Sequence, residues 1–426
     1  MAFTIFVVAF VVLFAVGMPI SFAMALSSVV YALVGHVDMA FFSLEAFKAL
    51  NSFTLTAIPM FMLTAEVMNY TTVADKMFNF ANSLTGWIPG GLGHTNVVTS
   101  VIFAGMSGSA AADTGGIGFL SFKAMKDRGF DPAFSASVTA ASACIGPIIP
   151  PSIPVVIYAM TVTEASVGKM FVAGVVPGIF MAVAMMLYIA YISKRRGYPV
   201  EKKPTRHELG VAVRQGILPV LTPVVLLVTI SSGVVTISEG AVITVLYSCL
   251  LGFVIYRNMG LKKLLACCRN VCLTIGTILL FLIVSKMFQF VIAKENLVNT
   301  ISQAVYGLTT SKFAIMLMVN VFFLVMGCLS DPLVNIMLFA PLAWKLVGPL
   351  GIDASVFGMI VVFNCMVGLI TPPVGSNCYL ISGITGVPLA RIFKEGMPFV
   401  VGFLIILVLM SVFPQVVGFL PGLIFK

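Results

Sequence analysis

The sequence predicts an all-α polytopic membrane protein, built as an inverted-topology repeat with broken helices and re-entrant hairpins. Hydrophobic residues make up 60% of the 426 residues and charged residues only 9%, whereas a soluble domain carries about 25% charged residues. Gly and Pro interrupt several apolar segments, and the two halves of the chain match each other at a constant offset. This composition excludes a soluble enzyme, a disordered chain and a nucleic-acid-binding domain.

The apolar segments follow one another along the whole chain, and a membrane span needs about 20 such residues. The first segment lacks a basic n-region, so we expect a retained membrane segment rather than a signal peptide. Several segments are too long for one simple helix. In order, they are 3–35, 51–70, 92–121, 133–162, 169–193, 215–237, 240–256, 270–293, 311–345, 355–383 and 397–424.

Three of these segments are interrupted at positions that membrane helices normally avoid. The interruptions are GMSGSAAADTGG at 105–116, IGPIIPPSIP at 145–154 and VGLITPPVGSN at 367–377. Pro removes a backbone donor and Gly loosens a helix. Irregular backbone at membrane depth persists only against protein or a water-filled cavity. We therefore expect these three stretches to form the functional parts.

One long polar connector, KRRGYPVEKKPTRHE at 194–208, divides the chain near its middle. We expect a first repeat over 1–208, which ends in this connector, and a second repeat over 209–426. The net charge is +9. The basic residues lie between apolar runs, so they indicate membrane orientation rather than nucleic-acid binding.

The two repeats align without a gap when the first is shifted by 222 residues, which indicates an internal duplication. The matched positions include Gly105 with Gly327, Asp131 with Asp353, Gly146 with Gly368, and Pro150–Pro151 with Pro372–Pro373.

Charge asymmetry predicts that the duplication is inverted. If the connector is cytoplasmic, the GFD loop at 129–131 lies inside and its repeat partner, the GID loop at 351–353, lies outside. This tracing treats 270–308 as a hairpin that opens to the cytoplasm, which places Lys294 and Lys312 inside. Inverted repeats are a recurring architecture of secondary transporters.

Four charged residues lie away from the ends of the apolar segments, where they are costly and often functional. For Asp113 and Asp331 a functional role is favoured over a helix-end cap. For Glu66 and Lys286 a structural role near a hairpin end is favoured. The eight cysteines form no CxxC pair, so we expect reduced thiols that pack as small hydrophobic groups.

Broken helices suggest ion and substrate sites rather than catalysis. A half-helix that starts at a break offers free N–H groups to an anion, and the half-helix that ends there offers carbonyls to a hard cation such as Na⁺. Simple kinks are the alternative, but two double-proline breaks at equivalent positions favour ion sites. No Walker A, GxSxG or HExxH motif is present, so we expect no enzymatic activity and no transport driven by ATP bound to this chain.

These motifs resemble those of one transporter family. GMSGSAAADTGGIG, GFDPAFSASVTAASACIGPIIPPSIP and GLITPPVGSN are similar to the large membrane (M) subunit of tripartite ATP-independent periplasmic (TRAP) transporters, and the similarity covers essentially the whole chain. The resemblance implies an elevator-type, Na⁺-coupled importer in a bacterial inner membrane. It also implies a small four-helix membrane subunit and a periplasmic substrate-binding protein as partners. The implied substrates are organic acids, including four-carbon dicarboxylates and sialic acids.

The resemblance also implies site residues. One Na⁺ site would use Ser107, Ser109, Gly146, Ile149 and Pro151, and a second would use Gly327, Gly368, Thr371 and Val374. The substrate carboxylate would lie near Ser109, Asp113 and Ser152. No Arg lies in these interruptions, which leaves the carboxylate to helix ends, hydroxyls and Na⁺. A sialic acid, rich in hydroxyls, would use these side chains better than a plain dicarboxylate.

Two other readings remain open from the sequence. A channel with broken-helix hairpins would need no coupling ion and no binding protein. A membrane scaffold would not require polar interruptions at matched depths, so it ranks last.

Overall fold

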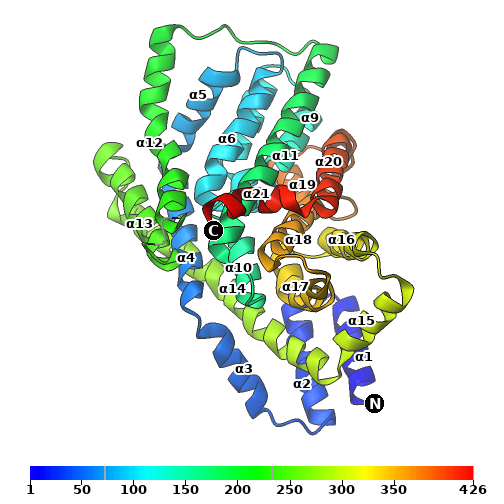
Figure 1. Ribbon diagram of the computed structural model, residues 1–426. Coiled ribbons are helices and arrows are strands. Elements are labelled where there is room, and N and C mark those ends of the chain that lie inside the picture. The colour runs from blue at the N-terminus through cyan, green and yellow to red at the C-terminus, as the bar shows by residue number, and fades with distance from the viewer. Residues whose placement is uncertain (72, 232–233, 426) are drawn as a thin grey trace.

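The computed structural model describes residues 1–71, 73–231 and 234–425, and all regular structure in these ranges is helical (Figure 1). Seven of the described helices are long and apolar enough to span a membrane. An eighth span results if α3 and α4, which meet at an angle of 56°, form one broken span. The predicted all-α polytopic membrane fold is confirmed.

The first half of the chain contains one very short helix of 6 residues, α7, directly after its first break, and it ends in the long helix α11. Its helices are α1 (Ala2–Ala15), α2 (Ile20–Val34), α3 (Ala40–Leu50), α4 (Ala57–Asn69), α5 (Val73–Thr85), α6 (Gly91–Ser107), α7 (Ala110–Gly115), α8 (Ile117–Asp127), α9 (Pro132–Ala143), α10 (Ile153–Thr161) and α11 (Val167–Arg196), with a 3₁₀ turn at Phe53–Thr56.

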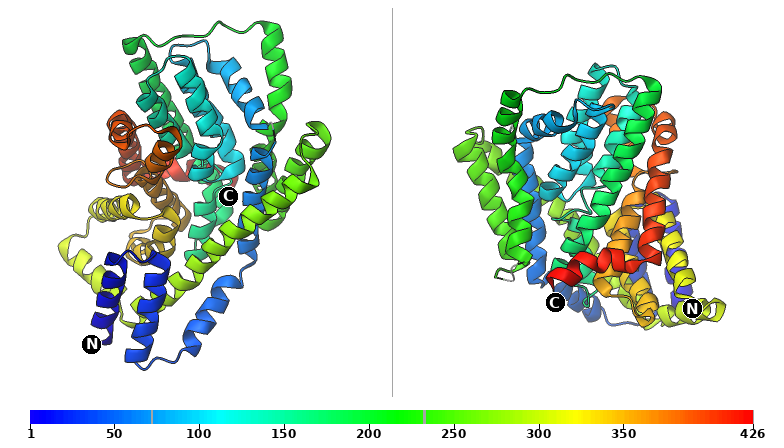
Figure 2. Two further views of the ribbon diagram at one scale, coloured as in Figure 1. Left: turned by 180° about the vertical axis from the view of Figure 1, so that it is seen from behind. Right: turned by 45° about the horizontal axis from the view of Figure 1, so that its top comes forward.

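The second half begins with two helices on one flank of the molecule, and its third helix crosses the molecule diagonally toward the other flank, which α16–α20 form (Figures 1 and 2). Its helices are α12 (Arg206–Ser231), α13 (Ile237–Leu250), α14 (Leu261–Lys294), α15 (Leu297–Leu308), α16 (Lys312–Leu329), α17 (Pro332–Val347), α18 (Ala354–Gly368), α19 (Ser376–Thr385), α20 (Leu389–Val412) and α21 (Pro414–Ile424), with a π-helical turn at Leu251–Ile255 and a 3₁₀ turn at Gly348–Leu350.

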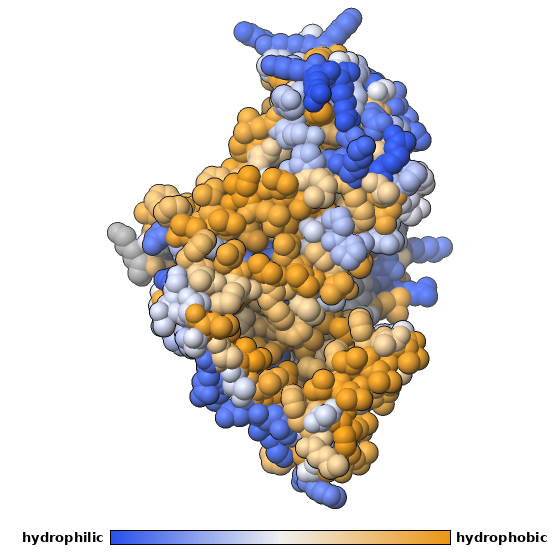
Figure 3. Space-filling view, turned by 90° about the vertical axis from the view of Figure 1, so that its right-hand side faces the viewer, coloured by the Kyte–Doolittle hydropathy of each residue, from blue (hydrophilic) through white to orange (hydrophobic). Residues whose placement is uncertain are grey.

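The surface has the polarity expected of a protein embedded in lipid. On the face shown in Figure 3, hydrophobic side chains cover the middle of the molecule and hydrophilic side chains gather at one end. Many large apolar side chains are exposed, such as Leu187 on α11 at 68% and Leu246 on α13 at 64%. Exposed apolar area on this scale marks a membrane-facing surface.

The N-terminal segment 3–35 is not one span. It forms two helices of 14 and 15 residues, α1 and α2, which pack against each other. Gly17 between them has a φ of +88°, a conformation that favours glycine. Each helix is shorter than the roughly 20 residues that a simple span needs. Tyr31 on α2 donates a hydrogen bond to the Glu295 carboxylate, which ties the pair to the end of α14.

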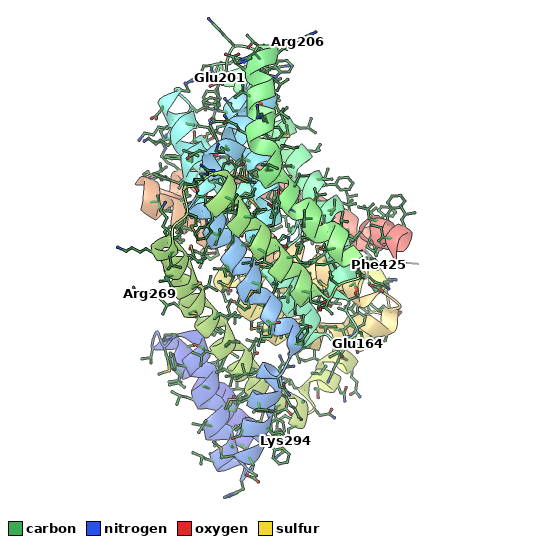
Figure 4. The ribbon with its side chains drawn as sticks, turned by 90° about the vertical axis from the view of Figure 1, so that its left-hand side faces the viewer. Glu164, Glu201, Arg206, Arg269, Lys294 and Phe425 are labelled. Atoms are coloured by element: carbon green, nitrogen blue, oxygen red, sulfur yellow. The ribbon has the colours of Figure 1, made fainter. Side chains whose placement is uncertain are left out.

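The expected hairpin at 270–308 is wrong. Helix α14 runs for 34 residues from Leu261 to Lys294 without a break, because no Pro or helix-ending Gly interrupts it. Lys294 therefore lies at the end of the molecule opposite Arg206 and Glu201 (Figure 4). The placement of Lys294 on the same side as the connector is wrong, and the placement of Lys312 depended on the same hairpin.

Three segments that are distant in sequence gather at the connector end of the molecule. They are the GFD loop after α8, the connector after α11, and the start of α20. Three ion pairs join them: Arg128–Glu201 at 2.8 Å, Arg196–Glu395 at 2.9 Å and Arg391–Asp131 at 3.3 Å.

The GID loop lies near the other end of α11. Ser355, just after this loop, accepts a hydrogen bond at 3.1 Å from the backbone N–H of Ser166, which precedes α11. Tyr158 on α10 donates to the carbonyl of Ala354 at 3.2 Å. Since the GFD loop meets the C-terminal end of α11 and the GID loop its N-terminal end, equivalent loops lie at opposite ends. This is the arrangement of an inverted repeat.

The core is centred on α9 and α18, the helices that precede the two double-proline breaks. Every residue of α18 is buried, and so is every residue of α9 after Pro132. Helix α9 is rich in Ala, Ser and Thr, and small residues let membrane helices approach closely. The first of these breaks is therefore buried at the centre of the protein, whereas Pro372, Pro373 and Val374 of the second are exposed.

Candidate functional site

The first break separates α6 from α7 and is built around three residues. Helix α6 ends at Ser107, Gly108 adopts a left-handed conformation with φ +58°, and Ser109 caps α7. The Ser109 hydroxyl accepts from the N–H of Ala112 at 3.4 Å. The Ser107 hydroxyl donates to the Ser109 carbonyl at 3.4 Å. Both serine oxygens keep lone pairs that a cation could use.

The second break, between α9 and α10, packs directly against the first. A Cβ atom at Gly108 would lie 2.4 Å from the carbonyl oxygen of Pro151. A Cβ at Gly146 would lie 3.7 Å from the carbonyl of Ser109. Position 108 thus requires glycine for two reasons, its left-handed backbone conformation and the close approach of the Pro151 carbonyl. Four members of the first predicted Na⁺ site, Ser107, Ser109, Gly146 and Pro151, are brought to one junction.

The remaining predicted residue of that site, Ile149, lies in the same loop. It is 9% exposed. The loop is held against α11, because a Cβ at Gly174 would lie 2.1 Å from the carbonyl oxygen of Ile148 and a Cβ at Gly178 would lie 2.4 Å from the Ile149 side chain. Because Gly174 and Gly178 have no side chain, the loop packs closely against α11, and this contact holds the loop carbonyls in place.

Ser152, a predicted substrate residue, caps α10. Its hydroxyl accepts from the N–H of Val155 at 3.2 Å and donates to the carbonyl of Pro147. The side chain has no exposed surface. Both hydrogen bonds are structural, so contact between Ser152 and a substrate stays a prediction.

The second half repeats this junction with other residues. A Cβ at Gly368, the last residue of α18, would lie 2.6 Å from the carbonyl carbon of Gly327 on α16. Thr371 donates its hydroxyl hydrogen to the carbonyl of Val367 at 2.7 Å. Val374 lies in the same loop and is 39% exposed. The predicted members of the second Na⁺ site thus lie at one junction and in the loop that follows it.

Asn377 connects the two halves of the site. It is the second residue of α19, and its amide donates to the carbonyl of Ala140 on α9 at 3.3 Å and approaches the sulfur of Cys144 at 3.7 Å. The sequence shows an amide in this break, but it gives no sign that the amide reaches the other repeat. Helix α19 also packs against α7, so the breaks of both halves share one centre.

Asp113 is enclosed in a polar network that sequence reasoning missed. It has no exposed surface, and the Ser100 hydroxyl lies 3.3 Å from its Oδ1 and 3.1 Å from the hydroxyl of Ser142. Ser142 donates in turn to Asn96 at 3.1 Å. Polar residues four apart on α6 (Asn96 and Ser100) in a buried helix would have been the sequence clue.

One oxygen of this carboxyl group, Asp113 Oδ2, has no hydrogen-bond partner within the described residues. An unpaired buried oxygen costs about 1–3 kcal/mol, and more if it is charged. A ligand hydroxyl or another donor would remove that cost. The geometry therefore sets Asp113 apart from an ordinary helix cap.

The other intramembrane ionisable residues have structural partners. Asp331 caps α17, accepting from the N–H of Leu333 at 2.8 Å, which is the helix-cap role that the sequence left as the alternative. Glu66 accepts from Asn270 at 3.4 Å. Lys286 donates to Gln289 at 3.5 Å.

The oxygens gathered at the two junctions come from carbonyl and hydroxyl groups. Within residues 1–71, 73–231 and 234–425, no three His, Cys, Asp or Glu side chains form a possible metal site. Uncharged oxygen donors suit a hard cation better than a soft transition metal. Na⁺ is thus a chemically suitable ion for both junctions.

Comparison with known families identifies the protein class. A family profile described as "Tripartite ATP-independent periplasmic transporter, DctM component" matches residues 7–416. The chain belongs to this family. The predicted resemblance is confirmed, and this TRAP large subunit is a multi-pass transport protein of the bacterial inner membrane.

Individual relatives of this TRAP subunit cover nearly its whole length. It is 34% identical over 408 residues to the sialic acid TRAP transporter large permease protein SiaM of Vibrio cholerae, covering 96% of this chain and 95% of that protein. It is 33% identical over 384 residues to the C4-dicarboxylate TRAP transporter large permease protein DctM of Pseudomonas aeruginosa, covering 89% of each.

A solved structure shares the fold of this subunit. The YdaH transporter of Alcanivorax borkumensis aligns with a TM-score of 0.61 over 90% of this chain and 87% of that chain, at 14% sequence identity. At this identity the likeness concerns the fold alone.

Proposed function

We propose that the protein is a Na⁺-coupled importer subunit that moves an organic acid across the inner membrane. The observation that carries the proposal is the pair of junctions, Gly108 against Pro151 and Gly327 against Gly368, one in each repeat. Each junction gathers carbonyl and hydroxyl oxygens at the end of a broken helix, as coupling-ion sites in secondary transporters do.

An elevator motion of one central body accompanies this coupling in the proposal. Asn377 hydrogen-bonds to Ala140, and Tyr158 to Ala354, so contacts between the halves favour joint movement of the two junctions. The hairpin α1–α2 packs on α14 instead. In the proposal this hairpin belongs to a fixed scaffold, against which the small four-helix membrane subunit packs, and a periplasmic binding protein delivers the substrate.

The proposed substrate is a hydroxyl-bearing acid of the sialic acid class, with four-carbon dicarboxylates as the alternative. Relatives named for both substrates support the organic-acid class. Ser109 at the break and the unpartnered Oδ2 of Asp113 favour a substrate that carries hydroxyl groups. Negative charge on the substrate is balanced in this arrangement by Na⁺ and helix N-termini.

Uptake into proteoliposomes tests the proposal. The protein is reconstituted with its small subunit, and radiolabelled sialic acid or succinate is supplied with the corresponding binding protein. We expect saturable sialic acid uptake that requires an inward Na⁺ gradient and the binding protein. Succinate uptake without sialic acid uptake would refute the substrate class. Unsaturable flux without Na⁺ would indicate a channel and refute the coupling.

A further inference from the structure

A groove of about 410 Å³ lies between the turn that precedes α6 and the C-terminal half of α11, away from both junctions. Val183, Leu187 and Lys194 line it from α11, and Pro89 and His94 line it from the turn and from α6. The three α11 residues are four and seven positions apart. They therefore follow one stripe along the helix, and the groove runs parallel to it.

The lower part of this stripe faces hydrocarbon. Val183 is 48% exposed and Leu187 is 68% exposed, and both lie in the central and later turns of a 30-residue helix that spans the membrane. Apolar side chains exposed at this depth are in contact with lipid acyl chains. The groove is thus open to the lipid phase along its length.

The upper end of the stripe is cationic and lies near the membrane–water boundary. Lys194 is exposed, and within the part of the chain that the structure describes it forms no ion pair, whereas nearby Arg196 pairs with Glu395. Lys203 Nζ lies 4.9 Å from the centre of the ring of Trp87, which lies in the turn that precedes α6. Tryptophan and lysine typically mark the headgroup level of a membrane.

The inner wall of the groove contains a buried imidazole with one unpartnered nitrogen. His94 is 2% exposed. Its Nε2 lies 3.0 Å from the carbonyl of Pro89, and because a carbonyl only accepts, Nε2 is the donor. Nδ1 has no partner within the described residues. In the neutral ring Nδ1 is an acceptor, so it lacks a hydrogen-bond donor such as a hydroxyl group.

We propose that this groove binds one phosphatidylglycerol molecule. An acyl chain lies along Val183 and Leu187, the phosphate lies beside Lys194, and a headgroup hydroxyl donates toward His94 Nδ1. Basic pockets between helices at the cytoplasmic side are suited to anionic lipid headgroups. A zwitterionic lipid such as phosphatidylethanolamine supplies a donor but no net charge for Lys194, so it fits less well.

The bound lipid would support a tight junction between two parts of the fold. A Cβ at Gly90 would lie 2.5 Å from the hydroxyl of Ser193, and a Cβ at Gly93 would lie 2.8 Å from the side chain of Ile189. The turn and α6 thus contact α11 directly beside the groove. We expect lipid binding to raise the thermal stability of this junction rather than to alter the Na⁺ sites.

Native mass spectrometry of the purified complex with the small subunit tests the proposal, with phosphatidylglycerol and phosphatidylethanolamine as probes. We expect Lys194→Gln to reduce retained phosphatidylglycerol about tenfold, the effect of losing roughly 1.4 kcal/mol. Arg195→Gln, which removes the neighbouring charge outside the groove lining, should retain the lipid. Leu187→Trp should fill the groove and displace the lipid, whereas Leu246→Trp, at an exposed position on α13, should not.

Several results would overturn this assignment. Unchanged retention in both Lys194→Gln and Leu187→Trp would mean that the lipid binds elsewhere. Equal retention of phosphatidylethanolamine would contradict recognition of charge, and displacement by excess inorganic phosphate would indicate a site for free anions. A crosslink from Leu187→Cys to the small subunit would identify that protein as the occupant. Melting curves without added lipid verify that each variant is folded.

Discussion

Two glycines of the second junction offer a matched test of the proposed Na⁺ site. Gly327 and Gly368 face each other at the ends of α16 and α18, and each can be replaced by alanine. A Cβ at Gly368 would lie 2.6–2.8 Å from three backbone atoms of Gly327, so α16 and α18 would have to separate. A Cβ at Gly327 would have its nearest neighbour at 3.5 Å, an ordinary van der Waals distance.

The expected magnitudes follow from these distances. Overpacking a tight contact costs about 1–3 kcal/mol, and replacing Gly by Ala in a helix recovers about 0.5–1 kcal/mol. For Gly368→Ala the net penalty is therefore about 1.3 kcal/mol, from the midpoints of the two ranges. If the displacement moves the carbonyl ligands of the Na⁺ site, the half-saturating Na⁺ concentration should rise about tenfold. For Gly327→Ala we expect a change of no more than about twofold, within the usual ±0.5 kcal/mol of a tolerated substitution.

The assay is substrate uptake into proteoliposomes against Na⁺ concentration, with equal amounts of each variant and of the partner proteins. The half-saturating concentration is compared rather than the maximal rate, because it is insensitive to the fraction of protein that reconstitutes. Thermal melting verifies that both variants are folded. Equal Na⁺ dependence in the two variants, or a larger effect of Gly327→Ala, would refute the argument from close contact.

Three further predictions concern other parts of the chain. Lys126 and Lys345 should lie on opposite faces of the membrane, because the loops that follow them meet opposite ends of α11; cysteine labelling of intact cells, in a background without native cysteines, should modify only the periplasmic position, Lys345→Cys, and finding both on one side would contradict the inverted repeat. Crosslinks from residues 3–35 to the small subunit should be insensitive to substrate while those from 105–116 change, and the reverse pattern would overturn the assignment of a fixed scaffold. Asp113→Asn should reduce transport, but less than the loss of a Na⁺ ligand, because it retains one oxygen acceptor; wild-type uptake at saturating Na⁺ would show that the unpartnered Oδ2 has no role.

The sequence predicted the elements whose reasons are local. Apolar composition indicated membrane helices, the Gly- and Ala-rich stretch at 105–116 located the break after α6, and the double-proline stretches located the breaks after α9 and α18. The constant offset of 222 residues placed Gly146 and Gly368 at equivalent junctions. In each case the relevant residue types are contiguous or evenly spaced, so the pattern is readable without tertiary contacts.

The features that were missed depend on distant contacts or on small differences between similar segments. Hydropathy alone could not show that α14 continues to Lys294 or that the two halves of 3–35 pack against each other across Gly17, because a long apolar segment has the same hydropathy whether it continues or folds back. The reach of Asn377 to Ala140 joins residues 237 positions apart. The hydrogen bonds around Asp113 likewise join α6, α7 and α9, and these become neighbours only in the folded protein.

The central claim is that each broken repeat holds one Na⁺, and the Na⁺ dependence of uptake in two hydroxyl variants tests it most directly. Ser107→Ala and Thr371→Ala each remove one hydroxyl oxygen from a predicted hard-cation site, one at each junction. Each should raise the half-saturating Na⁺ concentration in proteoliposomes that contain the partner proteins, by about tenfold if the lost ligand contributed about 1.4 kcal/mol. Unchanged Na⁺ dependence in both variants would contradict the claim, because neither junction would then bind the coupling ion.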